Sequence, residues 1–454
     1  MSKQAVVTRG RAFALKQMLS LLGRCSDQSI IKLTRAAEVV AREPEHKEQI
    51  AWLRNLFQQG HPSIELARRV LRDTSPRVRE GVLINLFVRA AWEGAEERAR
   101  FETSQGFYPP FLIVISPTMR CNLNCWGCYA GAYNPNEELT TEDVDRIVTE
   151  ATEMGIHFIT ISGGEPFIRK DLIEIYRKHS DVAFHIYTNG TLIDEETART
   201  LAELGNVAPA ISVEGFEQET DQRRGQGTHQ KIVAAMQALR SNGCIYGFSA
   251  TVTRHNVNIL TDERFIEHYL RLGTYFGWFF NYIPIGKHPS LDLMPTPKQR
   301  DRLRQRTLEI RRTKPIFVGD FWNDGPLTGG CMAGGRLYAH INHRGDVEPC
   351  VFSHFAVDNI HDKSLSEALD SEFFRAIRRR QPFNENHLAP CMIIDNPHVL
   401  RDVVAESHAH STDGGDALLT DLAPELDDYA QAYQAIARGP WEEGYGWAKR
   451  RDQA

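Results

Sequence analysis

The stretch Cys121-Asn122-Leu123-Asn124-Cys125-Trp126-Gly127-Cys128 decides how this chain is interpreted. Iron–sulfur clusters are held by cysteine thiolates, and three thiols this close can bind three corners of a four-iron cube. The fourth iron would then be free to hold a small molecule. Zinc is the first alternative, but a structural zinc site needs four ligands and no fourth is nearby. A disulfide reading fails because three is odd and nothing marks the chain as secreted.

A second motif lies downstream of the three cysteines. Residues 155–161 have the apolar pattern of a buried strand, which ends in Ser162-Gly163-Gly164-Glu165-Pro166. Two glycines at a strand end let the backbone approach a ligand closely, and Glu165 can accept a hydrogen bond from an ammonium group. A lone Gly-Gly-Glu-Pro is ordinarily just a turn. Its position after the cysteines makes a ligand-binding role the better interpretation.

Together the two motifs resemble the signature of the radical S-adenosylmethionine (SAM) superfamily. The resemblance implies a [4Fe-4S] cluster with an open iron, bound by Cys121, Cys125 and Cys128. It implies SAM as the second cofactor. It also implies SAM contacts from the cysteine loop, the glycine motif and the ends of two later strands: Trp126, Gly163, Gly164, Glu165, Asn189, Ser212 and Glu214.

Not all of these residues are equally specific. Trp126 matches an aromatic residue near the adenine, and packing is its alternative role. Asn189 is a weaker match because Thr-Asn-Gly is also a common turn. Arg223-Arg224-Gly225 resembles a loop of the peptide-modifying branch, although a loop of this composition is usually solvated. The sequence identifies no further catalytic residue.

The implied reaction begins with an electron from a donor such as flavodoxin or ferredoxin. Reductive cleavage of SAM then gives a 5′-deoxyadenosyl radical, which abstracts hydrogen from a substrate. The cofactor performs the hard step, while the protein positions it and excludes water.

Residues 110–285 alternate between strand and helix patterns, which predicts a parallel α/β sheet with helices outside. The ligands of such sheets lie at the carboxyl ends of the strands, and each motif above follows a predicted strand. The resemblance adds that the fold is a partial (βα)6, TIM-like barrel.

Composition bounds the remaining possibilities. The 454 residues suggest two to three domains, and 42% hydrophobic with 25% charged residues is typical of a globular protein. No apolar stretch approaches a membrane span, and the first residues lack the apolar core of a signal peptide. We therefore expect a reducing, cytoplasmic location. The net charge of −6 suggests no nucleic acid partner.

The first 105 residues or so read as helical, including a segment at Ala12–Leu22. A small bundle packed on the enzyme core is the simple interpretation. A docking surface for a partner, or for peripheral membrane contact, is the alternative, because residues 1–110 carry 18 Lys and Arg against 12 Asp and Glu.

The C-terminal third contains Cys331, Cys350 and Cys391. Thirteen residues separate Cys331 from Gly345, and a G-x4-C run follows. This spacing resembles the opening of SPASM and twitch modules and implies an auxiliary iron–sulfur cluster. Residues 340–348 read as a hairpin that brings Cys331 and Cys350 to opposite ends of paired strands. Buried, inert thiols are the alternative.

A full SPASM module has a denser cysteine run, so three thiolates suggest a single auxiliary cluster. Its fourth iron is either open or held by another group, with Asp395, His387 and His398 as weak candidates. An amphipathic helix is predicted at residues 365–379. The His408-x-His410 pair is more typical of a solvated loop than of a metal site.

We therefore predict four regions: a helical segment (1–108), a radical SAM core (109–290), an auxiliary-cluster module (291–400) and a helical tail (401–454). The helical N-terminus does not look like a leader-binding winged helix, which slightly favours a small molecule or lipid as the substrate. A peptide- or protein-modifying maturase is the alternative. A non-catalytic iron–sulfur interaction protein is the second alternative, and the intact Cys121, Cys125, Cys128 and Glu165 argue against it.

Overall fold

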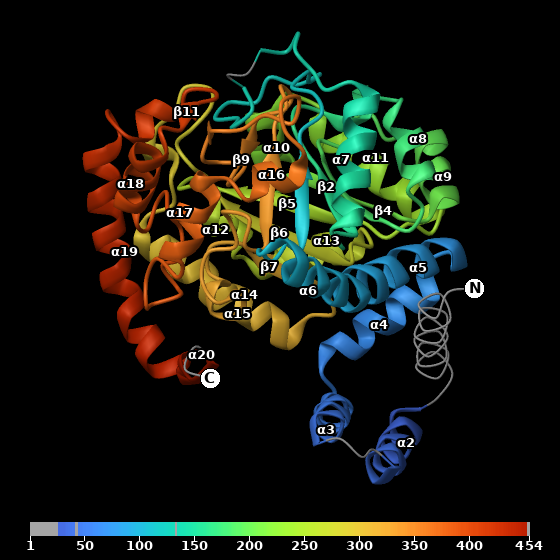
Figure 1. Cartoon of the computed structure of the whole chain (residues 1–454). Coiled ribbons are helices and arrows are strands. Elements are labelled where there is room, and N and C mark those ends of the chain that lie inside the picture. Colours follow the sequence, from blue (N-terminus) through green and yellow to red (C-terminus); the bar gives the residue numbers. More distant parts are fainter. Residues whose placement is uncertain (1–25, 41–43, 132–133, 452–454) are drawn as a thin grey trace.

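The computed structural model describes residues 26–40, 44–131 and 134–451, and its centre is one nine-stranded sheet (Figure 1). The strand order is β7-β6-β5-β4-β3-β2-β1-β8-β9, with every neighbouring pair parallel except β8 and β9. The strands are β1 (Leu112–Ile115), β2 (Phe158–Ile161), β3 (Ala183–Thr188), β4 (Val207–Val213), β5 (Gly247–Val252), β6 (Phe276–Asn281), β7 (Phe317–Asp320), β8 (Tyr338–Ile341) and β9 (Val347–Glu348).

Contacts across the sheet show that it is curled like a barrel wall. β3 and β6 are three positions apart, which is about 14 Å in a flat sheet, yet the rings of His185 and Phe276 are only 5.3 Å apart. The two flanks also meet, because Phe321, directly after β7, lies 5.9 Å from Tyr338 of β8. The predicted α/β class and TIM-like barrel are therefore confirmed, and β7 and β8 extend the six expected strands.

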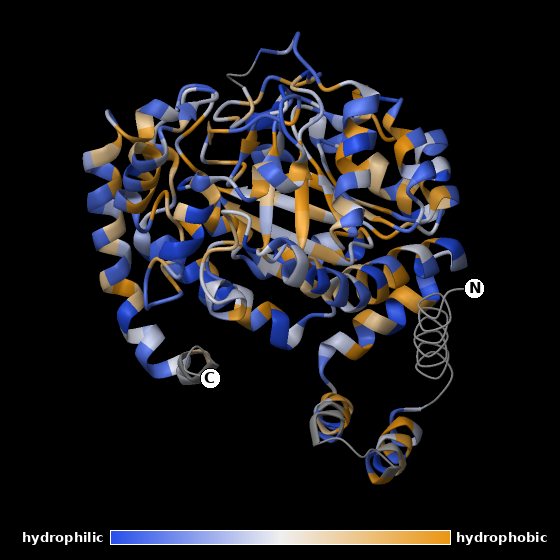
Figure 2. Ribbon diagram, in the orientation of Figure 1, coloured by the Kyte–Doolittle hydropathy of each residue, from blue (hydrophilic) through white to orange (hydrophobic). Residues whose placement is uncertain are grey.

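Helices cover the outer face of the curled sheet (Figure 1). Alternate strand residues such as Ile186, Phe248 and Phe279 point outward into one core formed with these helices, as the two-residue period of a strand requires. Figure 2 shows the resulting hydrophobic centre and the more polar outer surface. The helices are α7 (Thr141–Glu153), α8 (Leu172–Lys178), α9 (Glu195–Leu204), α10 (Glu217–Arg224), α11 (Thr228–Ser241), α12 (Val257–Leu260) and α13 (Glu263–Arg271).

The N-terminal region is helical wherever the structure describes it, as expected; the predicted helix at Ala12–Leu22 lies outside the described residues. Its elements are α2 (Asp27–Val40), α3 (Pro44–Gln58), α4 (Pro62–Asp73), α5 (Pro76–Leu83), the π-helix η1 (Ile84–Glu93) and α6 (Gly94–Gln105). The Asn85 side chain donates to the backbone carbonyls of Ser180 and Val182, and Arg98 donates to that of Gly155 at 2.7 Å. These contacts attach η1 and α6 to the amino end of the barrel, while α2 and α3 extend away from it (Figure 1).

The C-terminal third of the chain contributes strands to the same sheet as the core. The predicted hairpin forms from β8 and β9, and β8 pairs with β1, so the sheet crosses the predicted boundary at residue 290. The single helix expected at residues 365–379 is wrong: Asp370 and Ser371 interrupt it, and the Ser371 hydroxyl caps the second helix. The helices here are α14 (Pro297–Thr313), α15 (Gly325–Thr328), α16 (Leu365–Leu369), α17 (Glu372–Arg380), α18 (Pro397–Ser407), α19 (Ala423–Gly444) and α20 (Gly446–Arg451). β10 (Phe355–Ala356) and β11 (His410–Ser411) form a separate two-stranded ribbon, and short 3-10 turns are η2 (Pro166–Ile168), η3 (Leu291–Leu293) and η4 (Gly415–Leu418).

Within the described part of the chain, no helix is both long and apolar enough to cross a bilayer. The four predicted region boundaries remain predictions.

Candidate active site

The loop that carries Cys121, Cys125 and Cys128 leaves the carboxyl end of β1 and packs on the glycine motif after β2. The amide of Gly164 donates to the Thr118 carbonyl at 2.9 Å, and the amide of Glu165 donates to the Arg120 carbonyl at 2.8 Å. A Cβ on Gly164 would lie 2.2 Å from the Arg120 oxygen. The glycines thus allow close approach, but what approaches them is the cysteine loop itself.

The three thiols are free, and they are partly accessible at this edge of the sheet. Burial raises the pKa of Cys121 to about 11, and Glu165, Cys125 and Cys128 act on it from nearby. The amide of Leu123 donates to the Cys121 sulfur at 3.4 Å, as donors to thiolates do at iron–sulfur sites. Free thiols that act electrostatically on one another fit an iron–sulfur cluster.

Glu165, the predicted SAM ammonium contact, is fully buried and joins the ends of β2 and β3. Its carboxylate accepts from the Asn189 amide at 2.7 Å, the Thr188 hydroxyl at 2.7 Å and the Phe167 amide at 3.0 Å. Burial raises the pKa of this carboxyl, and the three donors oppose the shift. A carboxylate has about four acceptor positions, so one remains for an ammonium group.

Asn189 connects this strand end to the cysteine loop. Its side-chain amide donates to Asn122 Oδ1 at 2.8 Å and lies 3.8 Å from the Cys121 sulfur. The backbone amide and the hydroxyl of Thr191 both donate to the side-chain oxygen of Asn189, Oδ1. Asn189 therefore helps to hold the conformation of the cysteine loop, in addition to forming the turn that its Thr-Asn-Gly sequence predicts.

Glu214, the second carboxylate at this edge, holds two arginines. Its Oε1 accepts from Arg223 Nη1 at 2.6 Å and from Arg224 Nη2 at 2.6 Å, and its side chain is 1% exposed. Arg223 continues to the carbonyls of Trp126 and Gly127 at 3.3 and 3.2 Å. The interpretation of these arginines as solvated is wrong, because the buried carboxylate after β4 holds them inside, against the cysteine loop.

Two more of the predicted SAM contacts, Ser212 and Trp126, are accessible to a ligand. Ser212 lies near the end of β4 and is partly exposed. Trp126 is 37% exposed, and its ring nitrogen donates to the Gln222 carbonyl at 3.3 Å. The Arg223 guanidinium lies 5.6 Å from its ring centroid. An exposed ring fixed from beneath can stack on a planar ligand.

Cys331, Cys350 and Cys391 form a second group on the C-terminal side of the barrel. Burial raises the pKa of Cys350 to about 12, and Cys331 acts on it from nearby; Cys391 in turn interacts with both. The antiparallel hairpin puts the segment before β8 and the segment after β9 at the same end. The expectation that Cys331 and Cys350 lie at opposite ends is therefore wrong.

Tyr338 is buried among these three thiols, which the sequence did not indicate. Its hydroxyl donates to the Cys350 sulfur at 2.8 Å, and Cys331 and Cys391 are also close enough to act on its charge. Asp395, a candidate fourth ligand, is already engaged: both oxygens bind Arg300, and Oδ2 also accepts from the Cys391 amide at 3.0 Å.

The two remaining candidates for a fourth ligand are histidines with different surroundings. His387 packs on Trp441, with ring centroids 5.2 Å apart, and His398 is exposed on α18. In the described ranges, no three His, Cys, Asp or Glu side chains converge closely enough for a single metal ion. A cluster differs in this respect, because each thiolate binds a different iron.

One aromatic contact and one polar chain connect the two cysteine groups. Tyr129, next to Cys128, lies 5.6 Å from Phe352, two residues after Cys350. Beside it, the Ser116 hydroxyl lies 2.8 Å from His340 Nε2, and His340 Nδ1 lies 2.6 Å from Glu348. This fully buried chain links the end of β1 to the β8–β9 hairpin, and so fixes one loop relative to the other.

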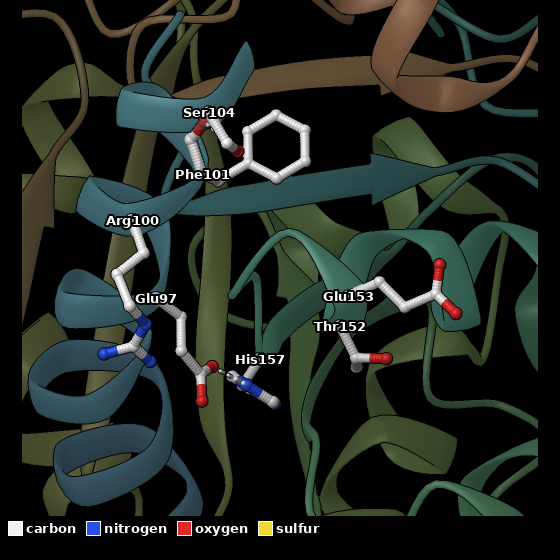
Figure 3. Close-up of a pocket in the computed structure, with 7 residues that line it drawn as sticks. All are labelled: Glu97, Arg100, Phe101, Ser104, Thr152, Glu153 and His157. Atoms are coloured by element: carbon white, nitrogen blue, oxygen red, sulfur yellow. Dashed lines mark hydrogen bonds and ion pairs between the residues drawn. The ribbon is translucent and has the colours of Figure 1, made fainter.

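A cavity of about 360 Å³ lies at the opposite edge of the sheet, between α6, α7 and the segment before β2 (Figure 3). His157, which precedes β2, pairs there with Glu97 at 2.9 Å. Since the loop with Cys121, Cys125 and Cys128 and the glycine motif both follow the carboxyl ends of strands, this cavity is separate from the candidate active site.

Comparison with known proteins agrees with this geometry. The family model of the radical SAM superfamily matches residues 115–272, and the SPASM iron-sulfur cluster-binding domain matches residues 331–392. The chain is 26% identical over 300 residues to an AdoMet-dependent heme synthase of Methanosarcina barkeri (59% of this chain, 85% of the relative). It is 30% identical over 280 residues to a mycofactocin maturase MftC of Mycobacterium ulcerans (58% and 72%).

A third relative is a PqqA peptide cyclase of Bradyrhizobium diazoefficiens, 29% identical over 274 residues (55% of this chain, 68% of the relative). Among solved structures, Streptococcus suis SuiB bound to S-adenosylmethionine superposes with a TM-score of 0.53 at 18% identity (64% and 73%). The chain belongs to the radical SAM superfamily and carries a C-terminal SPASM domain. It is accordingly an enzyme that uses a [4Fe-4S] cluster and SAM, with an auxiliary iron–sulfur cluster implied by the second domain.

Proposed function

We propose that this enzyme cleaves SAM reductively and abstracts a hydrogen atom from a peptide or protein substrate. The observation that carries the first half is the docking of the cysteine loop on the glycine motif, which brings Cys121, the first of the three thiols, close to the Glu165 carboxylate. When bound, the cluster supplies the electron that splits SAM into methionine and a 5′-deoxyadenosyl radical. An external donor such as flavodoxin or ferredoxin supplies that electron in turn.

The chain's own residues have distinct parts in this proposal. Cys121, Cys125 and Cys128 hold the cluster, and the open acceptor position of Glu165 receives the SAM ammonium group. Trp126 offers its exposed ring to the adenine. The Glu214 carboxylate already pairs with two arginines. Its role therefore includes fixing the cysteine loop through Arg223, and is not limited to a contact with the ribose of SAM.

Cys331, Cys350 and Cys391 are proposed to hold the auxiliary cluster. The short aromatic link between Tyr129 and Phe352 keeps it close to the first cysteine loop. An electron released by substrate oxidation then has a nearby acceptor, which permits a net two-electron oxidation.

The relatives support a peptide substrate better than the small molecule or lipid favoured by the helical N-terminus. One of them is a PqqA peptide cyclase. A small molecule remains the second candidate, because other relatives are AdoMet-dependent heme synthases.

The test is an anaerobic assay of 5′-deoxyadenosine formation from SAM and a strong reductant. We expect product from the reconstituted enzyme and none from a Cys121/Cys125/Cys128→Ala variant. A Cys244→Ala variant is the matched control, since Cys244 is a buried thiol after α11 and should leave product unchanged. No product from a fully iron-loaded enzyme, even with cell extract added, would refute the first half.

The second half is tested by adding the peptide and the small-molecule fractions of that extract separately. Stimulation by the peptide fraction, abolished when the fraction is pretreated with protease, is the expected result. Stimulation by the small-molecule fraction alone would favour the second candidate.

A further inference from the structure

The buried chain of Ser116, His340 and Glu348 joins the end of β1 to the β8–β9 hairpin. The Ser116 hydroxyl lies 2.8 Å from His340 Nε2, and His340 Nδ1 lies 2.6 Å from Glu348 Oε2. All three residues are 0% exposed. A carboxylate can only accept hydrogen bonds, so Nδ1 carries a proton and the ring presents Nε2 to Ser116. The histidine ring is therefore fixed from both sides.

The order serine, histidine and carboxylate is also that of a hydrolytic triad, in which the serine attacks an acyl group. Such a serine must be within reach of its substrate. Ser116 has no exposed surface, and the glycine motif covers it, because a Cβ on Gly163 would lie 3.4 Å from the Ser116 Cβ. The chain is therefore not a nucleophile site, and its effect depends on the elements that it holds together.

The Ser116 end of the chain supports the glycine motif. The Ser162 amide donates to the Ile115 carbonyl at 2.9 Å, and the Ser116 amide donates to the Ile341 carbonyl at 2.9 Å. The end of β1 thus lies between the glycine motif on one side and β8 on the other. Gly163 has a φ of +111°, a conformation that glycine adopts far more readily than other residues. A displacement of this strand end would therefore reach the predicted SAM contacts.

The Glu348 end of the chain belongs to the side that carries the auxiliary thiols. Besides His340, the carboxylate accepts hydrogen bonds from the side chains of Thr412 and Asn342. Cys350 follows only two residues after Glu348. The strand that carries this carboxylate therefore leads directly to an auxiliary thiol.

β8 connects the two ends through one of its faces. Side chains two residues apart on a strand point the same way, and Tyr338 and His340 are such a pair. Tyr338 donates to the Cys350 sulfur among the auxiliary thiols, while His340 reaches Ser116. One strand of four residues therefore relates the auxiliary thiols to the glycine motif.

We propose that His340 is a positioning residue for SAM binding, which holds the Ser116 end of β1, and with it the glycine motif, against the auxiliary-cluster side. The affinity for SAM then depends on β8, although β8 carries none of the predicted SAM contacts. This inference rests on the proposed function, because it takes Gly163 and Gly164 as part of the SAM site.

The experiment measures the dissociation constant of SAM for the anaerobically reconstituted full chain by equilibrium dialysis. Ser116→Ala removes the link to β1 and leaves the pair of His340 and Glu348 intact. It should weaken SAM binding by about fivefold, the factor that one net hydrogen bond represents, while the EPR spectrum of the auxiliary cluster stays unchanged. His340→Gln, whose amide can both donate and accept, should bind SAM more tightly than His340→Leu.

Two comparisons separate positioning from a general loss of stability. The double variant of Ser116→Ala and His340→Leu should bind SAM no more weakly than the weaker single variant, because both changes break the same chain. His157→Leu is the matched control, since it breaks another pair of a buried histidine and a glutamate, 2.9 Å from Glu97 at the opposite edge of the sheet. It should leave the affinity for SAM unchanged.

Native SAM affinity in Ser116→Ala, with both clusters intact, would overturn the inference, and so would an equal loss of affinity in His157→Leu. If His340→Leu does not assemble its clusters, Ser116→Ala and His340→Gln decide the question. Absence of SAM cleavage in the native chain would instead refute the proposed function, so the two failures are distinguishable.

Discussion

Substituting Gly164 by alanine should displace the cysteine loop without disturbing the fold. The backbone of Gly164 is not in the left-handed conformation, so alanine can adopt it without strain. The effect of the substitution therefore depends only on the space available to the added methyl group. Its Cβ would lie 2.2 Å from the Arg120 carbonyl oxygen and 2.7 Å from the carbonyl carbon of Met119. Both neighbours are backbone atoms, which cannot rotate away.

The size of the effect follows from these contacts. Relief of the overlap requires a shift of about 1 Å in the loop backbone, and overpacking of this kind costs about 1–3 kcal/mol. The same shift weakens the two hydrogen bonds from Gly164 and Glu165 to the loop, worth about 1 kcal/mol each. We expect the free energy that holds the loop against the glycine motif to fall by roughly 2–5 kcal/mol in total. Most of this loss should be local, because the loop lies at the edge of the barrel.

The assay combines iron and sulfide content, thermal unfolding and 5′-deoxyadenosine formation on anaerobically reconstituted protein. The Gly164→Ala variant should lose most product formation while its unfolding temperature falls only slightly. Gly439→Ala in α19 is the matched control, since its Cβ meets nothing within 4 Å and alanine favours a helix. Native cluster content and native product yield in Gly164→Ala would refute the close-packing argument.

Three further predictions concern buried groups in the C-terminal half. Arg300→Met leaves the Asp395 carboxylate unpaired in a fully buried site and should lower the free energy of unfolding by about 3–5 kcal/mol; chemical denaturation checks this, and recovery in the double variant with Asp395→Leu is expected. Tyr338→Phe removes the donor to Cys350 and should move the reduction potential of the auxiliary cluster to more negative values, with the SAM cluster unchanged in an EPR-monitored redox titration; equal shifts in both clusters would contradict it. Burial raises the pKa of Asp320 to about 7, above the unfolded value of about 3.9, so the folded state retains its proton and stability should fall as pH rises from about 4 to about 7. Asp320→Asn should flatten that part of the unfolding profile, and an identical profile in the variant would count against a raised pKa.

The local sequence predicted the barrel well, because the pattern that marks each strand or helix lies within a few consecutive residues. The segment at residues 155–161 is an apolar run that ends in turn residues, and it forms β2, which ends at the predicted residue and begins three residues later. α14 and β7 were not predicted. The charged α14, with its run of arginines, lacks a clear apolar stripe, and the four residues of β7 are too few for a periodic signal.

The site was predictable to a similar extent and with similar gaps. The spacing of Cys121, Cys125 and Cys128 and the Gly-Gly-Glu-Pro motif are local patterns, so they could be found and interpreted from sequence. The burial of Arg223 could not, because its partner is a carboxylate nine residues away whose burial depends on the curled sheet. The hydroxyl of Tyr338 has no motif, since a tyrosine in a strand is ordinary.

The sequence by itself determined the superfamily, the parallel sheet and the edge of that sheet where chemistry occurs. It could do so because cluster ligation and strand periodicity depend on residues close together in the chain. Only the tertiary structure decided that β8 joins β1, that Cys331 and Cys350 share one end of a hairpin, and that His185 faces Trp278 across the barrel. Those contacts join residues far apart in sequence, and they exist only once twist and helix packing have curled the sheet on itself.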